Sequence, residues 1–129
     1  MQSEVIVRFG DLDPYNHVNH ARYFTYFESA RIEALEEMGF GMGRMLEAGI
    51  QIVLVEVKAG FHVAAGLHDR LVITTEVIEV GRATTTWHQE ARRDGELVVS
   101  LDVKAAFTNL EGRPRRLPEG FADAVARLA

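Results

Sequence analysis

Apolar residues recur along this chain at two different spacings, which predict different elements. From Glu4 to Phe9 they alternate with polar residues, a pattern typical of a strand, and Gly10 ends the run. From His20 to Met38 they return at helical intervals over a wide arc, which predicts one long helix. Gly39 follows in the left-handed position that commonly ends a helix.

Beyond Ile50, β-branched residues dominate and predict a mostly antiparallel sheet. The predicted strands cover residues 50–58, 61–65, 70–80, 83–92 and 96–108, with a hairpin turn at Asp94-Gly95. Residues 118–129 are predicted as a short terminal helix. Strands and helices do not alternate, so a doubly wound fold is excluded. We therefore expect a single α+β domain over residues 1–129, with the sheet deeply embracing the one long helix.

The composition fits one globular domain, with 47% hydrophobic and 26% charged residues. The chain has no cysteine, which excludes a disulfide framework, thiolate catalysis and cysteine-containing zinc sites. It has no basic leader and no apolar run of about 18 residues, so a soluble, cytoplasmic protein without membrane contact is expected. The net charge of −5 argues against nucleic-acid binding, although arginines gathered late in the chain leave room for a local anion site.

The segment just before the long helix concentrates the residues that are suited to acid-base chemistry. Positions 11–20 hold two aspartates, two histidines and two asparagines. A helix N-terminus offers unpaired N–H groups and partial positive charge that polarise a carbonyl oxygen, while a nearby carboxylate can attack or activate water. This combination favours acyl-transfer hydrolysis. No serine lies in a G-x-S-x-G elbow, and the five histidines form no HExxH pattern, so no metal site is predicted.

These residues also resemble the entry motif of hotdog-fold acyl thioesterases, most closely the 4-hydroxybenzoyl-CoA thioesterase group. The similar strings are Asp11-Leu12-Asp13, His17-Val18-Asn19, Ala21-Arg22-Tyr23 and Glu28-Ser29-Ala30-Arg31. The resemblance implies a long helix inside a curved antiparallel sheet, with an acyl-CoA substrate and no cofactor. It also implies a homodimer that pairs its sheets edge to edge, with active sites at the interface, and we expect dimers of dimers.

The resemblance assigns catalysis to Asp13, as a nucleophile or as a general base on water. An ordinary turn role would be the simpler interpretation of an aspartate before a proline. Phe9, Tyr15 and Tyr23 are expected to seal its loop and leave the carboxylate weakly solvated. His20 matches the position whose backbone N–H polarises the thioester oxygen, and its imidazole could protonate or position the leaving thiolate.

His17 matches a histidine of the plant acyl-carrier-protein thioesterases, although Tyr15 stands where those enzymes have asparagine. Catalysis and stabilisation of the loop both stay open for His17. Asn19 is expected to cap the helix and so support the substrate site. Glu28 and Arg31, three residues apart, are expected to form a surface or interface ion pair.

The remaining predicted contacts are to the substrate. Tyr23 is expected in the wall of the acyl pocket. The phosphates of coenzyme A favour arginines, because guanidinium groups bind phosphate bidentately. The candidates are Arg82, Arg113 and Arg115, and Thr84 is a candidate for lining the pantetheine channel.

Two alternative functions share this fold. A noncatalytic module could hold acyl-CoA or lipid in an apolar tunnel. An acyl-thioester hydratase has an aspartate and a histidine at a short interval, but the interval from Asp13 to His17 is four rather than the usual five. A binding module has no need of a carboxylate aimed at a thioester, so Asp13 favours catalysis.

Overall fold

The computed structural model describes residues 1–128, which form one antiparallel sheet and three helices. The strand order across the sheet is β1-β3-β4-β5-β2. The strands are β1 (Gln2–Ile6), β2 (Gln51–Phe61), β3 (Arg70–Val80), β4 (Thr84–Arg93) and β5 (Glu96–Thr108). The helices are α1 (His20–Glu37), α2 (Met42–Glu47) and α3 (Phe121–Leu128), and Phe9–Asp11 forms a 3-10 turn, η1. Ala129, the last residue of the predicted terminal helix, lies outside the described residues.

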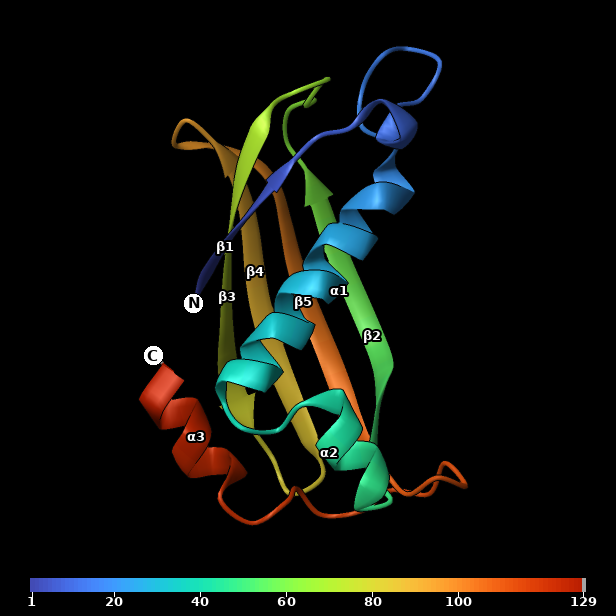
Figure 1. Ribbon diagram of the computed structural model, residues 1–129, viewed down its shortest axis with the longest axis vertical. Helices are drawn as coiled ribbons and strands as arrows, with labels where there is room; N and C mark the ends of the chain where they lie inside the picture. Colours follow the sequence, from blue (N-terminus) through green and yellow to red (C-terminus); the bar gives the residue numbers. More distant parts are fainter. Residues whose placement is uncertain (129) are drawn as a thin grey trace.

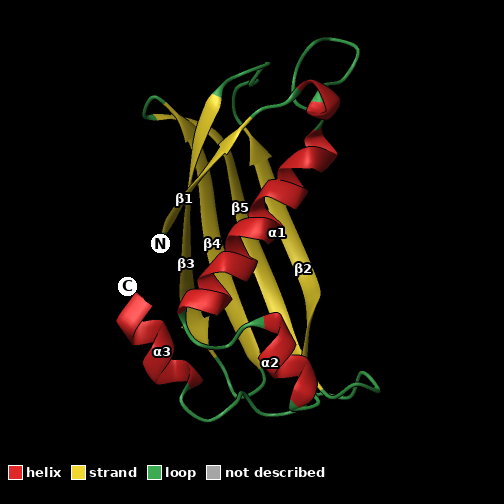
Figure 2. Ribbon diagram, viewed as in Figure 1, coloured by secondary structure: helices red, strands yellow, loops and turns green. Residues whose placement is uncertain are grey.

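Helix α1 lies diagonally across the concave face of the sheet, as the resemblance to hotdog-fold enzymes implied (Figure 1). Figure 2 shows that the long helix covers the middle strands, while α2 and α3 lie toward one end of the sheet. The core is made where α1 meets alternate residues of β3, β4 and β5. Its fully buried members include Phe27, Leu71, Ile73, Trp87, Leu101, Val103 and Phe107. Burying each such side chain contributes about 1.5–3 kcal/mol, so this contact fixes the helix on the sheet.

The sheet packs against one side of α1 and leaves the other side exposed. Tyr23, Phe27 and Ala34 are buried against the strands, whereas Thr25 and Ser29 on the opposite side are exposed. The apolar arc of α1 is wider than its buried side because it includes residues such as Phe24, which lines a cavity beside the helix and does not belong to the core.

Two predicted elements differ from the observed ones, and one observed element was not predicted. Strand β1 ends at Ile6, because the chain then turns into η1 with hydrogen bonds from the amides of Asp11 and Leu12. The predicted strand 61–65 does not form, since β2 runs unbroken to Phe61 and the chain then leaves the sheet. Helix α2 was not predicted; it has only six residues and begins among glycines.

Strand β2 has one free edge. It pairs with β5 and, within residues 1–128, with no other strand. A register shift between Leu54 and Glu56 leaves Val55 as an extra residue, 59% exposed. Exposed apolar side chains beside a free strand edge are typical of a surface that associates with another chain. No helix in residues 1–128 has the length and apolar content needed to cross a membrane.

Candidate active site

The loop before α1 is held in one conformation by backbone hydrogen bonds. Leu12 and Val18 form an isolated antiparallel bridge, and the amide of Asp13 donates to the carbonyl of His17 at 2.7 Å. The amide of Val18 donates to the carbonyl of Ala65, which ties the loop to the segment after β2. Asn16 takes a positive φ of 62°, a conformation that asparagine tolerates better than most residues. The sequence of this loop therefore specifies a rigid turn at the start of the helix.

The two carboxylate oxygens of Asp13 have different surroundings. Oδ1 accepts hydrogen bonds from the amides of Tyr15 and His17, at 2.9 and 3.1 Å. Oδ2 accepts no hydrogen bond from residues 1–128. Asp13 therefore does stabilise its own turn, as the simpler interpretation of an aspartate before a proline predicted, but only one of its two oxygens is used for this. The other oxygen of this half-buried side chain is free for chemistry.

The first amide of α1 is also free. Asn19 caps the helix as predicted, since its Oδ1 accepts from the amide of Ala21 at 2.9 Å. The amide of Arg22 donates to the carbonyl of Asn19. The amide of His20 has no acceptor within the described part of the chain. An unpaired N–H at a helix N-terminus is a natural site for a developing negative charge.

A cavity of about 390 Å³ joins these groups, and it is open to solvent in the single chain. Asp13, His17, His20 and Tyr23, four of the predicted site residues, lie together in its wall. The ring of His20 lies edge-on to Phe61, with centroids 6.4 Å apart. The complete lining is Asp13, His17, Val18, His20, Tyr23, Phe61, His62, Val63 and Ala64. The imidazole of His17 makes no hydrogen bond within residues 1–128, so the backbone of His17, and not its ring, stabilises the loop.

A second anchor holds the helix to the loop. The hydroxyl of Tyr26 donates to Asp11 Oδ2 at 2.6 Å, and the carbonyl of Asp11 accepts from the amide of Asn19. Burial, and then the hydrogen bond to Asp11, raises the pKa of Tyr26. The Tyr26 hydroxyl therefore stays protonated and serves as a fixed donor rather than as an acid or base.

The far wall of the cavity comes from His62, Val63 and Ala64, which begin the loop of residues 62–69. A pair that no local sequence pattern indicated holds this loop in place. Arg93 Nη1 donates to Asp69 Oδ2 at 2.8 Å and to the carbonyl of Ala64 at 3.2 Å. Asp69 Oδ2 also accepts from the amide of Gly66. This amide and then the Arg93 guanidinium hold the pKa of Asp69 below its usual value. Asp69 and the string Arg93-Asp94-Gly95 both belong to the resemblance to hotdog-fold thioesterases, but no local pattern pairs the two side chains.

The predicted seal over Asp13 is wrong for two of its three residues. In the single chain Phe9 is 79% exposed and Tyr15 80% exposed, while Tyr23 is buried. Phe9 lies in η1 rather than in a strand, so its side chain no longer follows the inward alternation of Val5 and Val7. The Asp13 carboxylate is therefore less enclosed than predicted.

The predicted coenzyme A contacts lie at the other end of the sheet. Arg82 is in the turn between β3 and β4, and Thr84 begins β4. Arg113 and Arg115 follow β5, where the amide of Arg115 donates to the carbonyl of Phe107. The cavity adjoins the opposite ends of these strands, and the ten residues of β4 span about 33 Å. Within one chain, the structure does not bring these four residues to Asp13.

The predicted ion pair between Glu28 and Arg31 does not form. Arg31 instead donates from Nη1 to Gln89 Oε1 of strand β4 at 2.8 Å. No acidic group within residues 1–128 lies within 4.0 Å of its guanidinium. Gln89, 58 residues away in sequence, therefore takes the place of Glu28 as the partner of Arg31.

Known proteins resemble this chain over most of its length. The acyl-CoA thioesterase YbgC of Haemophilus influenzae is 36% identical over 107 residues, covering 82% of this chain and 79% of that protein. The long-chain acyl-CoA thioesterase FadM of Escherichia coli is 30% identical, covering 86% and 83%. A crystal structure of a probable thioesterase from Bartonella henselae superposes with a TM-score of 0.87 at 28% identity, covering 92% and 98%. The model of the thioesterase-like superfamily matches residues 7–125, so the chain belongs to that superfamily.

Proposed function

We propose that the protein hydrolyses an acyl-CoA thioester in the cavity beside Asp13. The observation that supports this most directly is the pairing of two unused groups, the free Oδ2 of Asp13 and the unpaired amide of His20, in the wall of one cavity. A thioester carbonyl placed there has a donor for its oxygen and a carboxylate near its carbon. The names of the two relatives, both acyl-CoA thioesterases, support the same substrate class.

In the proposed reaction, Asp13 Oδ2 takes a proton from water while the water oxygen bonds to the thioester carbon. The carbonyl electrons move onto oxygen, where the His20 amide and the helix dipole stabilise the negative charge. Collapse of this intermediate breaks the carbon–sulfur bond and releases the free acid and the coenzyme A thiolate. The thiolate accepts the proton that Asp13 took from water, which restores the carboxylate. If Asp13 is instead the nucleophile, the same oxygen bonds to the carbon and the carbon–sulfur bond breaks, which releases the coenzyme A thiolate and leaves a mixed anhydride on Asp13. Water then hydrolyses this anhydride to the free acid and restores the carboxylate.

The active unit in this proposal is a dimer that pairs the free edges of two β2 strands antiparallel about a two-fold axis. Such a pairing places the Asp13 end of one chain beside the opposite end of its partner. The loop between β5 and α3 reaches out past β2 at that end (Figure 1). Arg113 and Arg115 of one copy would then meet the nucleotide phosphates of a substrate bound to the other copy.

The test separates the amide of His20 from its imidazole. His20→Pro removes the N–H, and proline is well accepted at the first helical position. Asn19 already has the extended backbone that a residue before proline adopts, with φ −60° and ψ 132°. His20→Ala removes only the ring. In a free-thiol assay over short, medium, aromatic and branched acyl-CoA, His20→Pro should lower kcat by about a hundredfold or more, and His20→Ala by less than about tenfold.

Asp13→Asn completes the test, because its amide oxygen can still accept the two turn hydrogen bonds. It should lower kcat by about a hundredfold or more. Near-normal turnover in Asp13→Asn or His20→Pro would refute the assigned roles. Binding of acyl-CoA without thiol release would favour a noncatalytic carrier, and hydration of an enoyl-CoA would favour the hydratase.

A further inference from the structure

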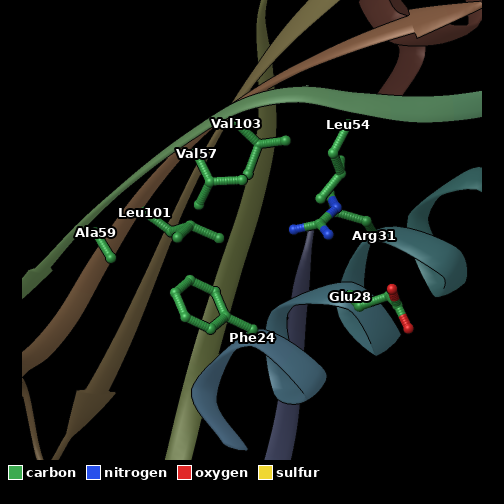
Figure 3. A pocket seen from close by; sticks show the side chains of 8 residues that line it. All are labelled: Phe24, Glu28, Arg31, Leu54, Val57, Ala59, Leu101 and Val103. Carbon is green, nitrogen blue, oxygen red and sulfur yellow. The ribbon is translucent and has the colours of Figure 1, made fainter. Parts of the chain in front are cut away.

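A second cavity of about 330 Å³ lies one helical turn farther along α1. His20 and Phe24 are four residues apart on the helix, and Phe61 and Ala59 are two apart on β2, so each pair shares a face. Both cavities therefore lie along the side of α1 that faces β2, and the space between this helix and β2 is here called the groove. The lining of the second cavity is Phe24, Glu28, Arg31, Leu54, Val57, Ala59, Leu101 and Val103 (Figure 3). Arg31 and Glu28 are its charged members, in otherwise apolar surroundings.

The guanidinium of Arg31 is held in place by a buried polar network. Gln89 is fully buried, and its amide nitrogen donates to the carbonyl of Phe27 and to Thr75 Oγ1, both at 3.0 Å. These two bonds fix the orientation of the Gln89 amide, so that its oxygen faces Arg31 and accepts from Nη1. The network anchors the guanidinium by one nitrogen and leaves its other donors for the groove.

Glu28 also lines the cavity, but its carboxylate makes no ion pair with this cation. Burial lowers the pKa of Arg31, and the charge of Glu28 only partly opposes that effect. Figure 3 shows the guanidinium directed toward the apolar side chains of the cavity and the carboxylate of Glu28 directed away from them. A desolvated cation in apolar surroundings gains most from a bidentate anionic partner, and a carboxylate has the geometry that fits a guanidinium.

We propose that the groove binds the acyl chain and that Arg31 binds a carboxylate at its distal end, so the preferred substrates are coenzyme A monothioesters of dicarboxylic acids. This proposal rests on the proposed function, because the groove begins where the thioester carbonyl would lie. Arg31 is eleven residues beyond His20, a rise of about 16 Å along the helix, and its side chain leans back toward the helix N-terminus. Because the guanidinium reaches back along the helix, the acyl chain has to span less than this rise, and a chain of medium length is long enough.

The experiment compares acyl-CoA substrates whose acyl chains differ only at the end distal to the thioester. Dicarboxylic monothioesters of about six to twelve carbons, chosen to span the rise along the helix, are matched with methyl-terminated acyl-CoA of equal length. For the wild type, kcat/KM should favour the carboxylate by about thirtyfold at the best length, which is typical for one desolvated charge pair. Arg31→Gln keeps an amide donor for Gln89 and should bring this ratio close to one. Arg31→Lys should restore part of the ratio, and Arg127→Met, on the exposed side of α3, is the matched control.

Three outcomes are distinguishable. If the wild type hydrolyses both series equally, or prefers the methyl-terminated chains, the role of Arg31 is overturned and the thioesterase proposal stands. If Arg31→Gln dissociates the dimer in sedimentation and loses activity equally on both series, the guanidinium pairs with a second copy of this chain. That result also overturns the proposed role of Arg31 in binding a substrate carboxylate. If no acyl-CoA releases thiol, the proposed function itself fails.

Discussion

At the scale of single residues, one side chain combines a structural role with the chemical role that we propose for it. Asp13 uses Oδ1 to close its own turn and keeps Oδ2 free. His20 likewise begins the helix while its amide stays unpaired. The turn restricts the rotation of the Asp13 carboxylate, so the free oxygen is held at the helix N-terminus before any substrate binds. Such preorganisation lowers the cost of orienting the reacting groups.

His88, which lies away from the site, shows how the charge of one side chain makes the stability of the fold depend on pH. On the face of the sheet opposite α1, its Nδ1 lies 2.8 Å from Asp102 Oδ1 and its Nε2 lies 3.1 Å from Glu90 Oε2. The hydrogen bonds to Asp102 and then to Glu90 raise the pKa of His88 above its ordinary value of about 6.5. The folded state therefore holds this proton more tightly than the unfolded state. The resulting stability is fully present below about pH 6.5 and is lost as the pH rises through the raised value.

We predict that His88→Gln lowers the free energy of unfolding at about pH 6 and changes it much less at about pH 9. Urea unfolding of both proteins at the two pH values measures the difference. His68→Asn is the control, because it removes an imidazole that has no carboxylate partner within residues 1–128 and asparagine tolerates the φ of 68° there. A difference between wild type and His88→Gln that did not vary with pH would mean that packing, not charge, is responsible.

At the scale of elements, the sequence predicted what depends on local signals. The helix beginning at His20 followed from apolar spacing and from the Asn19 cap, and the β4–β5 hairpin followed from Asp94-Gly95, where both residues take positive φ. The loop at positions 11–19 was also predicted, together with four of the residues that line the cavity. These features are encoded by residues close together in the chain.

What the sequence did not predict depends on contacts between distant residues. The segment 62–65 looks like a strand by composition, yet the amides of His62 and Val63 both donate to Val98 and the chain turns away to meet the loop at Val18. Arg31 has an acid nearby on the helix, but a glutamine on the sheet holds its guanidinium. No local pattern carries such information, because the tertiary arrangement decides which partner is within reach.

The loop of residues 62–69 makes the next prediction, which concerns Arg93 as a positioning residue. Arg93→Met removes the hydrogen bonds to Asp69 and to the carbonyl of Ala64, so this loop should open more often. Hydrogen exchange should become faster for residues 63–68 and at the amide of Val18, which donates to Ala65. The free energy of unfolding should fall by only about 1 kcal/mol, because the ion pair is partly exposed.

The same variant should lower kcat/KM, because Val63 and Ala64 line the cavity. Arg92→Met is the matched control, because Arg92 bonds to Glu90 and to the carbonyl of Gly95 and makes no hydrogen bond to residues 62–69. Unchanged exchange at residues 63–68 in Arg93→Met would show that the remaining bonds, such as Gly66 to Asp69, suffice to hold the loop.

At the scale of the whole molecule, the single chain looks incomplete as a catalyst. Its cavity is open, the aromatic residues Phe9 and Tyr15 are exposed, and the free edge of β2 carries exposed apolar side chains. The arginines suited to phosphate lie at the far end of the sheet. One antiparallel pairing of β2 with a second copy would cover this edge and bring the arginines of one chain beside the cavity of the other.

A mixing experiment tests whether the site is shared between two copies. Asp13→Asn lacks the carboxylate, and Arg113→Ala should raise KM for acyl-CoA far more than for a truncated pantetheine thioester that lacks the nucleotide phosphates. In a mixed dimer, one site combines Asp13 from one chain with Arg113 from the other, while the second site lacks both. Random exchange of subunits should therefore recover about a quarter of wild-type activity at low acyl-CoA concentration. If Arg113 serves the site of its own chain, the mixture retains only the average activity of its two parents.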